Sequence, residues 1–384
     1  MDFTPDEDHE AIAEGVRRVC TAFDDEYWAG CEAEHTFPWE FYRRMAEGGW
    51  LGIAIPEEYG GGGRGIAEAA IVLREVARSG AAMNGCSALH LTIFGLNPVV
   101  RFGSEKLKQA FLPRAAAGEL HVAFGVTEPD AGTDTSRITT RAEPDGEGGY
   151  VVRGRKVWTS KALESEVVLL LVRTGGEGFG GLSLLLADLD PDYVDIRPIP
   201  KMGRNAVASC EVAYDGLPVP GWRLVGEEGK GWRQILHGLN PERILLAAEA
   251  TGIGEVALAR AVAYAREREV FARPIGANQA IAHPLAQAHI QLAAAWQLAQ
   301  HAAWRYDQGL DCGEAAQSAK YLAAEASFFA ADRAVQTFGG MGYATEYHVE
   351  RYFREARLQR IVPISQEMTL NYIAQQVLKL PRSY

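Results

Sequence analysis

The spacing of apolar residues changes twice along the chain, and this change constrains the fold more than any other feature of the sequence. From residue 1 to about 120, apolar residues recur every three or four positions, as in HEAIAEGVRRVCTAF, which predicts helices. From about 121 to 235, short runs such as EVVLLLVRT alternate with Gly, Pro and Asp turns, which predicts a small antiparallel β-domain. From about 236 onward, longer helical segments return and suffice for a bundle. We therefore predict an α+β multidomain protein with domains at 1–120, 121–235 and 236–384.

The overall composition excludes several classes of protein. A net charge of −12 over 384 residues argues against nucleic acid as the main partner, because no basic excess is available to meet phosphates. No apolar run approaches the roughly 20 residues needed to cross a bilayer, and the acidic start MDFTPDEDHE lacks the features of a signal peptide. Five scattered cysteines without a CxxC pair favour reduced thiols over disulfides or a zinc site. We expect a cytoplasmic protein without a metal or a membrane segment.

Two segments of the predicted β-domain are candidates for ligand binding. AFGVTEPDAGTD, residues 123–134, is a strand that runs into a turn whose backbone N–H groups and hydroxyls can bind a polar ring edge or a phosphate. RKVWTS, residues 155–160, places Trp158 before two hydroxyl residues, although a tryptophan in this setting is most often a core residue. Occurring together in one domain, the two segments indicate a flat aromatic ligand.

Five motifs in this order resemble the acyl-CoA dehydrogenase family over essentially the whole chain. They are AFGVTEPDAGTD, KVWTS, MGRNAVASCEVAYDGLPVP followed by LVGEEGKGW, REREVFARPIGANQAI, and QTFGGMGYATEYHVERYFREAR. The resemblance implies an N-terminal helical domain, a middle antiparallel β-domain and a C-terminal four-helix bundle. It also implies FAD as cofactor and α,β-dehydrogenation of an acyl-CoA thioester. Ala272 and Lys161 replace the family's usual glycine and asparagine without affecting the assignment.

The resemblance also implies which residues bind FAD and acyl-CoA. Residues of the β-domain are expected to line the flavin and its pyrophosphate, and these are Phe124, Val126, Thr127, Gly132, Thr133, Trp158, Thr159 and Ser160. Residues of the helical bundle are expected to hold the ADP half across a homodimer interface, and these are Arg268, Phe271, Gln279, Gln336, Gly339 and Gly340. Ser365 and Glu367 fall at positions that contact cofactor. Thr133, Asn240, Arg243 and His90 are expected to meet the substrate, with His90 in the wall of the acyl pocket.

The chain departs from the family where most members carry their catalytic glutamate. The family motif there reads Tyr-Glu-Gly-Thr, whereas this chain has Val362-Pro363-Ile364-Ser365. Proline cannot abstract a proton, and it lacks the backbone N–H that in the family helps to bind the thioester oxygen. A minority of the family, including isovaleryl-CoA and long-chain acyl-CoA dehydrogenases, carries the base just before an arginine in an earlier helix, and Glu242-Arg243 resembles that arrangement.

The segment LNPERILLAAE also has an interpretation that needs no catalytic role. Asn240 suits an N-cap and Pro241 the first helical position, so a helix is predicted to start here with Glu242 in its first turn. A carboxylate is favoured there by the helix dipole. Glu242 is therefore either the general base or a helix-starting residue.

The sequence is also compatible with two other classes of function. One is a flavin oxidase or monooxygenase on the same fold, and the other is a catalytically silent subunit that binds FAD or acyl-CoA. For the dehydrogenase, the resemblance implies an electron-transferring flavoprotein as electron acceptor and a homodimer or homotetramer as the assembly.

Overall fold

The structure is a computed structural model that describes residues 6–382. Within residues 6–382, seven α-helices come first: α1 (Glu7–Cys20), α2 (Asp25–Glu34), α3 (Trp39–Glu47), α4 (Ile66–Val76), α5 (Ala82–Ile93), α6 (Asn97–Phe102) and α7 (Glu105–Ala116). Seven strands follow in the described part of the chain: β1 (Val122–Gly125), β2 (Arg141–Pro144), β3 (Tyr150–Ser160), β4 (Val167–Arg173), β5 (Leu182–Asp188), β6 (Val194–Pro198) and β7 (Ser209–Val219). The predicted order of helices, strands and helices is confirmed.

The last part of the chain is again mainly helical. It contains α8 (Gly231–Glu267), β8 (Glu269–Val270), β9 (Arg273–Pro274), α9 (Gln279–Asp307), α10 (Gly313–Phe338), α11 (Val349–Gln359) and α12 (Gln366–Tyr372). Among the described residues, no helix combines the length and the apolar character that crossing a bilayer requires.

The strands form one seven-stranded sheet in the order β1-β4-β2-β3-β7-β6, with β5 paired to β4. The sheet is antiparallel as predicted, except that β1 runs parallel to β4 and β2 meets β4 in a single parallel pair. Strand β4 is apolar from Val167 to Val172, and both of its faces are buried there. One face, with Val168 and Leu170, packs against β3 and β7, and the other, with Leu169, packs in a core that includes Phe111 of α7.

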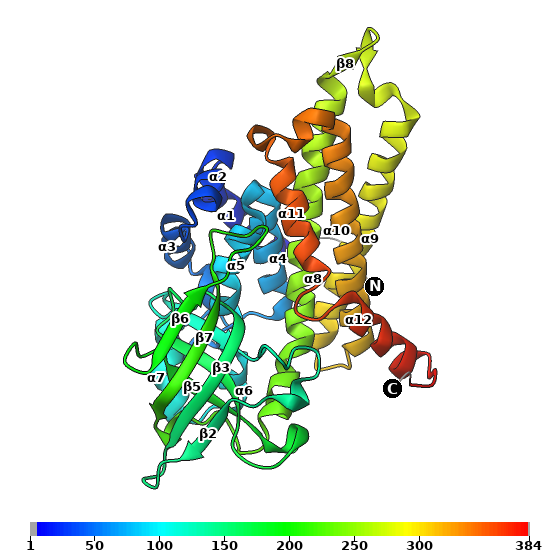
Figure 1. Cartoon of the computed structure of the whole chain (residues 1–384). Helices are drawn as coiled ribbons and strands as arrows, with labels where there is room; N and C mark the ends of the chain where they lie inside the picture. The colour runs from blue at the N-terminus through cyan, green and yellow to red at the C-terminus, as the bar shows by residue number, and fades with distance from the viewer. Residues whose placement is uncertain (1–5, 383–384) are drawn as a thin grey trace. The chain divides into compact units, whose positions relative to one another are not determined.

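The C-terminal helices α8, α9, α10 and α11 run alongside one another, as Figure 1 shows, and form the predicted four-helix bundle. Alanines lie where α8, α9 and α10 meet, including Ala250, Ala295 and Ala323. Their small side chains allow the helix axes to approach closely. The hairpin of β8 and β9 connects α8 to α9 at one end of the bundle (Figure 1).

The predicted start of the helix at Asn240 is wrong. Helix α8 begins at Gly231 and continues through Pro241, which lies inside it. Residues 231–239 are themselves amphipathic, with Gln234, Ile235 and Gly238 buried, so they extend the helix toward the N-terminus. A proline inside a helix removes one backbone hydrogen bond and crowds the preceding turn, which costs about 3 kcal/mol or more. Helix α8 nevertheless continues through Pro241, with Ile235 before it and Ile244 after it buried. Glu242 therefore does not lie in a first turn.

The chain divides into two compact units. The first comprises the described residues up to Gly30, residues Gly65–Cys86, and the chain from Asn240 onward. The second comprises Cys31–Arg64 and Ser87–Leu239. The boundary at Leu239 and Asn240 falls inside α8, next to Pro241. The predicted three domains, with limits near 120 and 235, are consecutive segments of the chain, whereas each of these two units combines separate segments. The three-domain division stays a prediction.

Candidate functional site

The two ligand-binding segments predicted in the β-domain lie side by side. The backbone N–H of Val157 donates to the carbonyl oxygen of Thr127 at 2.9 Å, and Lys156 Nζ donates to the carbonyl oxygen of Val126 at 2.9 Å. The end of β1 therefore runs next to the part of β3 that carries Trp158. The structure thus brings Val126 and Thr127 close to Trp158, which the sequence places far away.

Trp158 presents its ring at the surface of this unit. The pairing of β3 with β7 shifts register between Lys156 and Thr159, and Trp158 has a positive φ of 61°. This irregularity leaves the tryptophan side chain 55% exposed, although both neighbours, Val157 and Thr159, are more deeply buried. The alternative interpretation of Trp158 as a core residue is therefore wrong. A large exposed aromatic face beside a strand end is suited to stacking against a flat ring.

A buried ion pair stabilises the turn that follows β1. Lys156 Nζ lies 2.9 Å from Glu128 Oε1, and the same carboxylate accepts hydrogen bonds from the backbone N–H groups of Thr139 and Thr140. Burial alone raises the pKa of Glu128, but Lys156 and these hydrogen bonds outweigh burial and lower it to about 2. Glu128 is therefore an ionised structural residue that shapes the turn, and it is not a base.

The donor set of the β-domain fits a flavin and a phosphate. Gly132 and Thr133 are exposed in the loop after β1, and a Cβ added at Gly132 meets no heavy atom within 4 Å. The hydroxyl Oγ1 of Thr159 is buried without a hydrogen-bond partner, and Ser160 is half-buried. An exposed indole ring, hydroxyl groups and an unobstructed glycine backbone are the groups that hold a polar heteroaromatic ring and its phosphates. Phe124 is half-buried in β1.

The residues predicted to bind the ADP half gather at one end of the bundle. Tyr264 of α8 stacks on Phe338 of α10, with ring centroids 4.1 Å apart and planes inclined by 17°. This contact joins the ends of the two helices, and therefore Arg268, one turn after Tyr264, lies at the same end as Gly339. Exposed side chains and open glycines share this end, and these are Arg268, Phe271, Gln279, Gln336, Gly339 and Gly340.

Phe271 is the most exposed of these residues. It lies in the turn between β8 and β9 with a positive φ of 54°, and its side chain is 96% exposed. An aromatic side chain held in this strained conformation at the tip of a hairpin indicates a surface that another group covers.

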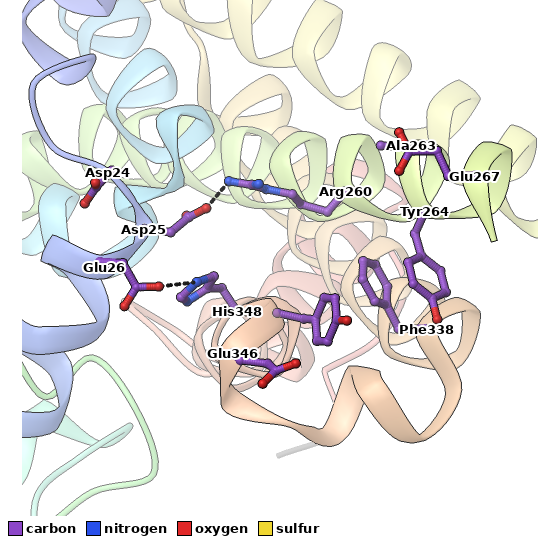
Figure 2. Close-up of a pocket in the computed structure, with 11 residues that line it drawn as sticks. Asp24, Asp25, Glu26, Arg260, Ala263, Tyr264, Glu267, Phe338, Glu346 and His348 are labelled. Atoms are coloured by element: carbon purple, nitrogen blue, oxygen red, sulfur yellow. Dashed lines mark hydrogen bonds and ion pairs between the residues drawn. The ribbon is translucent and has the colours of Figure 1, made fainter.

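A recess lies beside the aromatic pair, as Figure 2 shows. Arg260 pairs with Asp25 and His348 with Glu26 at 3.6 Å, so charges of both signs line it. Its lining residues are Asp24, Asp25, Glu26, Arg260, Ala263, Tyr264, Glu267, Phe338, Glu346, Tyr347 and His348. None of the residues predicted from the sequence to bind cofactor or substrate lines this recess.

Glu242 lies in the interior of α8, next to a buried arginine. The Glu242 side chain is half-buried, whereas Arg243 is only 8% exposed and donates through Nη1 to Asn240 Oδ1 at 2.9 Å. Burial lowers the pKa of Arg243, and the charge of Glu242 opposes this shift. Asn240 therefore orients Arg243 and does not cap a helix.

The segment that replaces the usual catalytic motif is anchored by a buried lysine. Lys320 Nζ donates to the carbonyl oxygen of Ile364 at 2.8 Å and to Gln366 Oε1 at 2.9 Å. Burial, followed by the charge of Arg243, lowers the pKa of Lys320 to about 8. The sequence gives no signal for this contact, because Lys320 lies in the middle of α10.

Glu367 is poorly suited to replace the missing base. It is exposed in the first turn of α12, where Ser365 is the N-cap and accepts from the backbone N–H of Met368 at 3.4 Å. Hydrogen bonds to its own backbone N–H and to Ser365 lower the pKa of Glu367. A carboxylate stabilised in its ionised form is a weaker base.

Helix α5 carries His90 and contacts the buried Lys161. In the sequence, Lys161 is distinguished only because it replaces the family's usual asparagine. His90 is 8% exposed. Two residues along, Thr92 Oγ1 accepts from Lys161 Nζ at 2.9 Å, and Ala88 O accepts from the same atom at 3.0 Å. Burial lowers the pKa of Lys161 to about 7. Burial and the charge of Lys161 lower the pKa of His121 to about 3.

Comparisons with known proteins agree on one family. Models of the acyl-CoA dehydrogenase N-terminal, middle and C-terminal domains match residues 6–119, 123–217 and 229–378. Acyl-CoA dehydrogenase FadE12 of Mycobacterium tuberculosis is 40% identical over 389 residues, which cover 100% of this chain and 99% of the relative.

Two solved structures are also similar to this chain over almost their whole length. One is a glutaryl-CoA dehydrogenase in complex with glutaryl-CoA, 31% identical, with a TM-score of 0.93 and coverage of 100% of this chain and 98% of that one. The other is butyryl-CoA dehydrogenase from Megasphaera elsdenii, 28% identical, with a TM-score of 0.94 and coverage of 98% and 100%. The chain belongs to the acyl-CoA dehydrogenase family and is an FAD-dependent oxidoreductase that dehydrogenates acyl-CoA thioesters.

Proposed function

We propose that this protein removes the α-proton of its acyl-CoA substrate with Glu242 while the β-hydrogen leaves as hydride to FAD. One observation carries the assignment of the base. Residues 362–365 contain no carboxylate, whereas Glu242 is half-buried beside the buried Arg243. Its place in the interior of α8 supports the assignment, because the stabilisation that a helix N-terminus gives to a carboxylate does not apply there.

Other residues of this chain bind FAD, orient the base and line the acyl pocket. Bound FAD supplies the hydride acceptor. We assign the flavin to the β-domain residues that end with Trp158, Thr159 and Ser160, and the ADP half to the exposed end of the bundle around Arg268. Arg243 orients the base through its neighbouring charge, while Asn240 fixes the guanidinium. Glu242 holds the abstracted proton, and His90 lines the acyl pocket.

The assembly proposed for this function is a homodimer or homotetramer. The support is the exposure of Phe271 and of the polar residues around Gly339, which suits an ADP half shared between two subunits. We further propose an electron-transferring flavoprotein as the acceptor and a cytoplasmic location for the reaction.

A panel of acyl-CoA thioesters tests this function. Anaerobic bleaching of the flavin by at least one of them, followed by turnover with an artificial electron acceptor, is expected for a dehydrogenase. Reoxidation of the substrate-reduced protein in air as fast as its reduction identifies an oxidase or monooxygenase instead. FAD-loaded protein that no acyl-CoA reduces identifies a silent binding subunit. Loss of bleaching in Glu242→Gln then tests the base itself.

A further inference from the structure

A single buried arginine contacts three serine hydroxyls in the β-domain unit. Arg204 lies in the loop before β7 and is 9% exposed. Its Nη1 donates to Ser87 Oγ and to Ser160 Oγ, each at 3.2 Å. Its Nη2 donates to Ser160 Oγ at 3.2 Å and also to Ser209 Oγ. Three separate segments of the chain therefore meet at one guanidinium group, and the proposed function assigns it no role.

The register of the sheet brings two of these serines together. Ser160 of β3 and Ser209 of β7 are directly opposite each other in the antiparallel pair. Side chains opposite each other in such a pair point to the same face of the sheet. The planar fork of Arg204 presents N–H groups in fixed directions and therefore reaches both hydroxyls at once.

The contacts of Arg204 decide what the Ser160 hydroxyl is able to do. A serine hydroxyl has two acceptor lone pairs and one donor proton. Two N–H groups of Arg204 approach the oxygen of Ser160, so they occupy its acceptor side. The proton of Ser160 is therefore directed away from Arg204, toward a different acceptor. Ser160 is half-buried and lies two residues after the exposed Trp158, so a ligand beside Trp158 is able to reach this hydroxyl and accept its proton.

The backbone around the cluster is strained and firmly held. Trp158, Lys161 and Arg204 have φ values of 61°, 62° and 59°, a region that residues with side chains rarely adopt. The loop of Arg204 is anchored by Asn205, whose side chain donates to Glu32 Oε1 at 3.0 Å. Strained residues persist only where surrounding contacts hold them, and they concentrate at functional sites.

We propose that Arg204 is a positioning residue that holds the Ser160 hydroxyl as an obligate hydrogen-bond donor toward FAD. The proposal rests on the proposed function, because the contact of Ser160 with FAD is part of it. Arg204 itself does not touch FAD; it acts through Ser160. The forked shape of the guanidinium is required, since a lysine ammonium at the end of a flexible stem does not present two N–H groups to one oxygen in a fixed geometry.

A double-mutant cycle on the FAD-loaded protein tests the proposal without any acyl-CoA. The FAD dissociation constant and the visible spectrum of the flavin are measured for wild type, Ser160→Ala, Arg204→Met and the double variant. We expect each single change to weaken FAD binding by about 5-fold, as for the loss of one net hydrogen bond. The double variant is expected to be no weaker than the singles, since both remove the same contact.

The control variant is Arg173→Met. Arg173, in the same unit, donates to the carbonyl oxygens of Ile138 and Ser136, each at 2.8 Å, so Arg173→Met removes a structural arginine. Its effect on FAD binding, if any, is expected to multiply with that of Ser160→Ala. If the effects of Arg204→Met and Ser160→Ala on the FAD dissociation constant multiply in the same way, the proposal is overturned. The proposed function is judged separately, by whether the wild-type protein dehydrogenates an acyl-CoA.

Arg204→Lys provides a second measurement and replaces Arg204→Met in the cycle if the methionine variant does not fold. We expect it to have the spectrum and the weakened FAD binding of Ser160→Ala, although the charge is kept. Wild-type FAD binding and spectrum in Arg204→Lys contradict a role for the fork. A failure of Glu242→Gln to lose activity does not bear on these measurements, because none of them involves turnover.

Discussion

The Nζ atom of Lys156 lies 2.9 Å from Oε1 of Glu128, and both side chains are almost completely buried. Removing one partner of such a pair leaves an unpaired buried charge, which costs about 3–5 kcal/mol. We therefore expect Glu128→Ala to lower the free energy of unfolding by this amount, measured by chemical denaturation. The exposed pair of Arg114 and Glu166, at 2.8 Å, provides a matched control. Glu166→Ala is expected to cost less than about 1 kcal/mol, and equal costs for the two variants contradict this account.

Glu242→Gln is expected to abolish most of the flavin reduction by acyl-CoA while FAD content and melting temperature stay near wild type. The amide keeps the size of the side chain but cannot accept the α-proton, and positioned general-base catalysis is worth roughly 10²–10⁴-fold. Single-turnover stopped-flow measurement of flavin bleaching reports this step directly. Glu367→Gln is the matched control, and its reduction rate is expected to stay close to wild type. If Glu242→Gln reduces the flavin at the wild-type rate, Glu242 is not the base.

Trp158→Ala is expected to weaken FAD binding, since it removes the exposed ring that we assign to stacking on the flavin. A favourable aromatic pair contributes about 0.5–1.5 kcal/mol beyond its area, which corresponds to roughly 2- to 13-fold in the dissociation constant. Titration of FAD into protein stripped of the cofactor measures this change. Trp304, which is 52% exposed on α9, is a matched control for the loss of a surface tryptophan. Equal FAD affinity in Trp158→Ala and Trp304→Ala excludes the stacking role.

Stability is expected to rise with pH between about 3 and 6.5, in part because of His121. Burial and then the charge of Lys161 lower the pKa of His121 from 6.5 to about 3. In this window the unfolded chain binds a proton at His121 that the folded protein does not, so acid favours unfolding. His121→Phe keeps a ring that stacks on Tyr42, where the centroids are 4.3 Å apart, and is expected to flatten the profile. The melting temperature measured from pH 4 to 8 follows this effect.

The same measurement on His289→Gln serves as the control, because His289 is exposed on α9. Its profile is expected to match wild type. A His121→Phe profile as steep as that of wild type shows that another group titrates in this window. At higher pH, Lys161 also makes stability rise with pH. Burial lowers its pKa from 10.5 to about 7, so between these values the unfolded chain binds a proton at Lys161 that the folded protein does not.

Much of the fold follows from the order of apolar periods along the chain. The short run EVVLLLVRT predicts a strand, and the structure has it as β4, whose burial on both faces only the structure shows. The longer helical segments near the end of the chain predict a bundle, because each helix has one apolar face to bury. The ordered motifs further identify the acyl-CoA dehydrogenase family, and with it FAD as cofactor.

The start of α8 and the contacts of single side chains depend on tertiary packing instead. Asn240 and Pro241 form a plausible local helix start, yet packing of residues 231–239 extends the helix beyond them. The ring of Trp158 is exposed because the pairing of β3 with β7 shifts register at that point. Arg204 contacts Ser160 because the pairing of β3 with β7 brings Ser160 next to Ser209, five residues after Arg204. A local sequence pattern does not show which distant residues become neighbours in this way. The sequence by itself therefore determines the family and the element order, whereas only tertiary contacts decide which exposed ring, buried charge and hydroxyl group lie together.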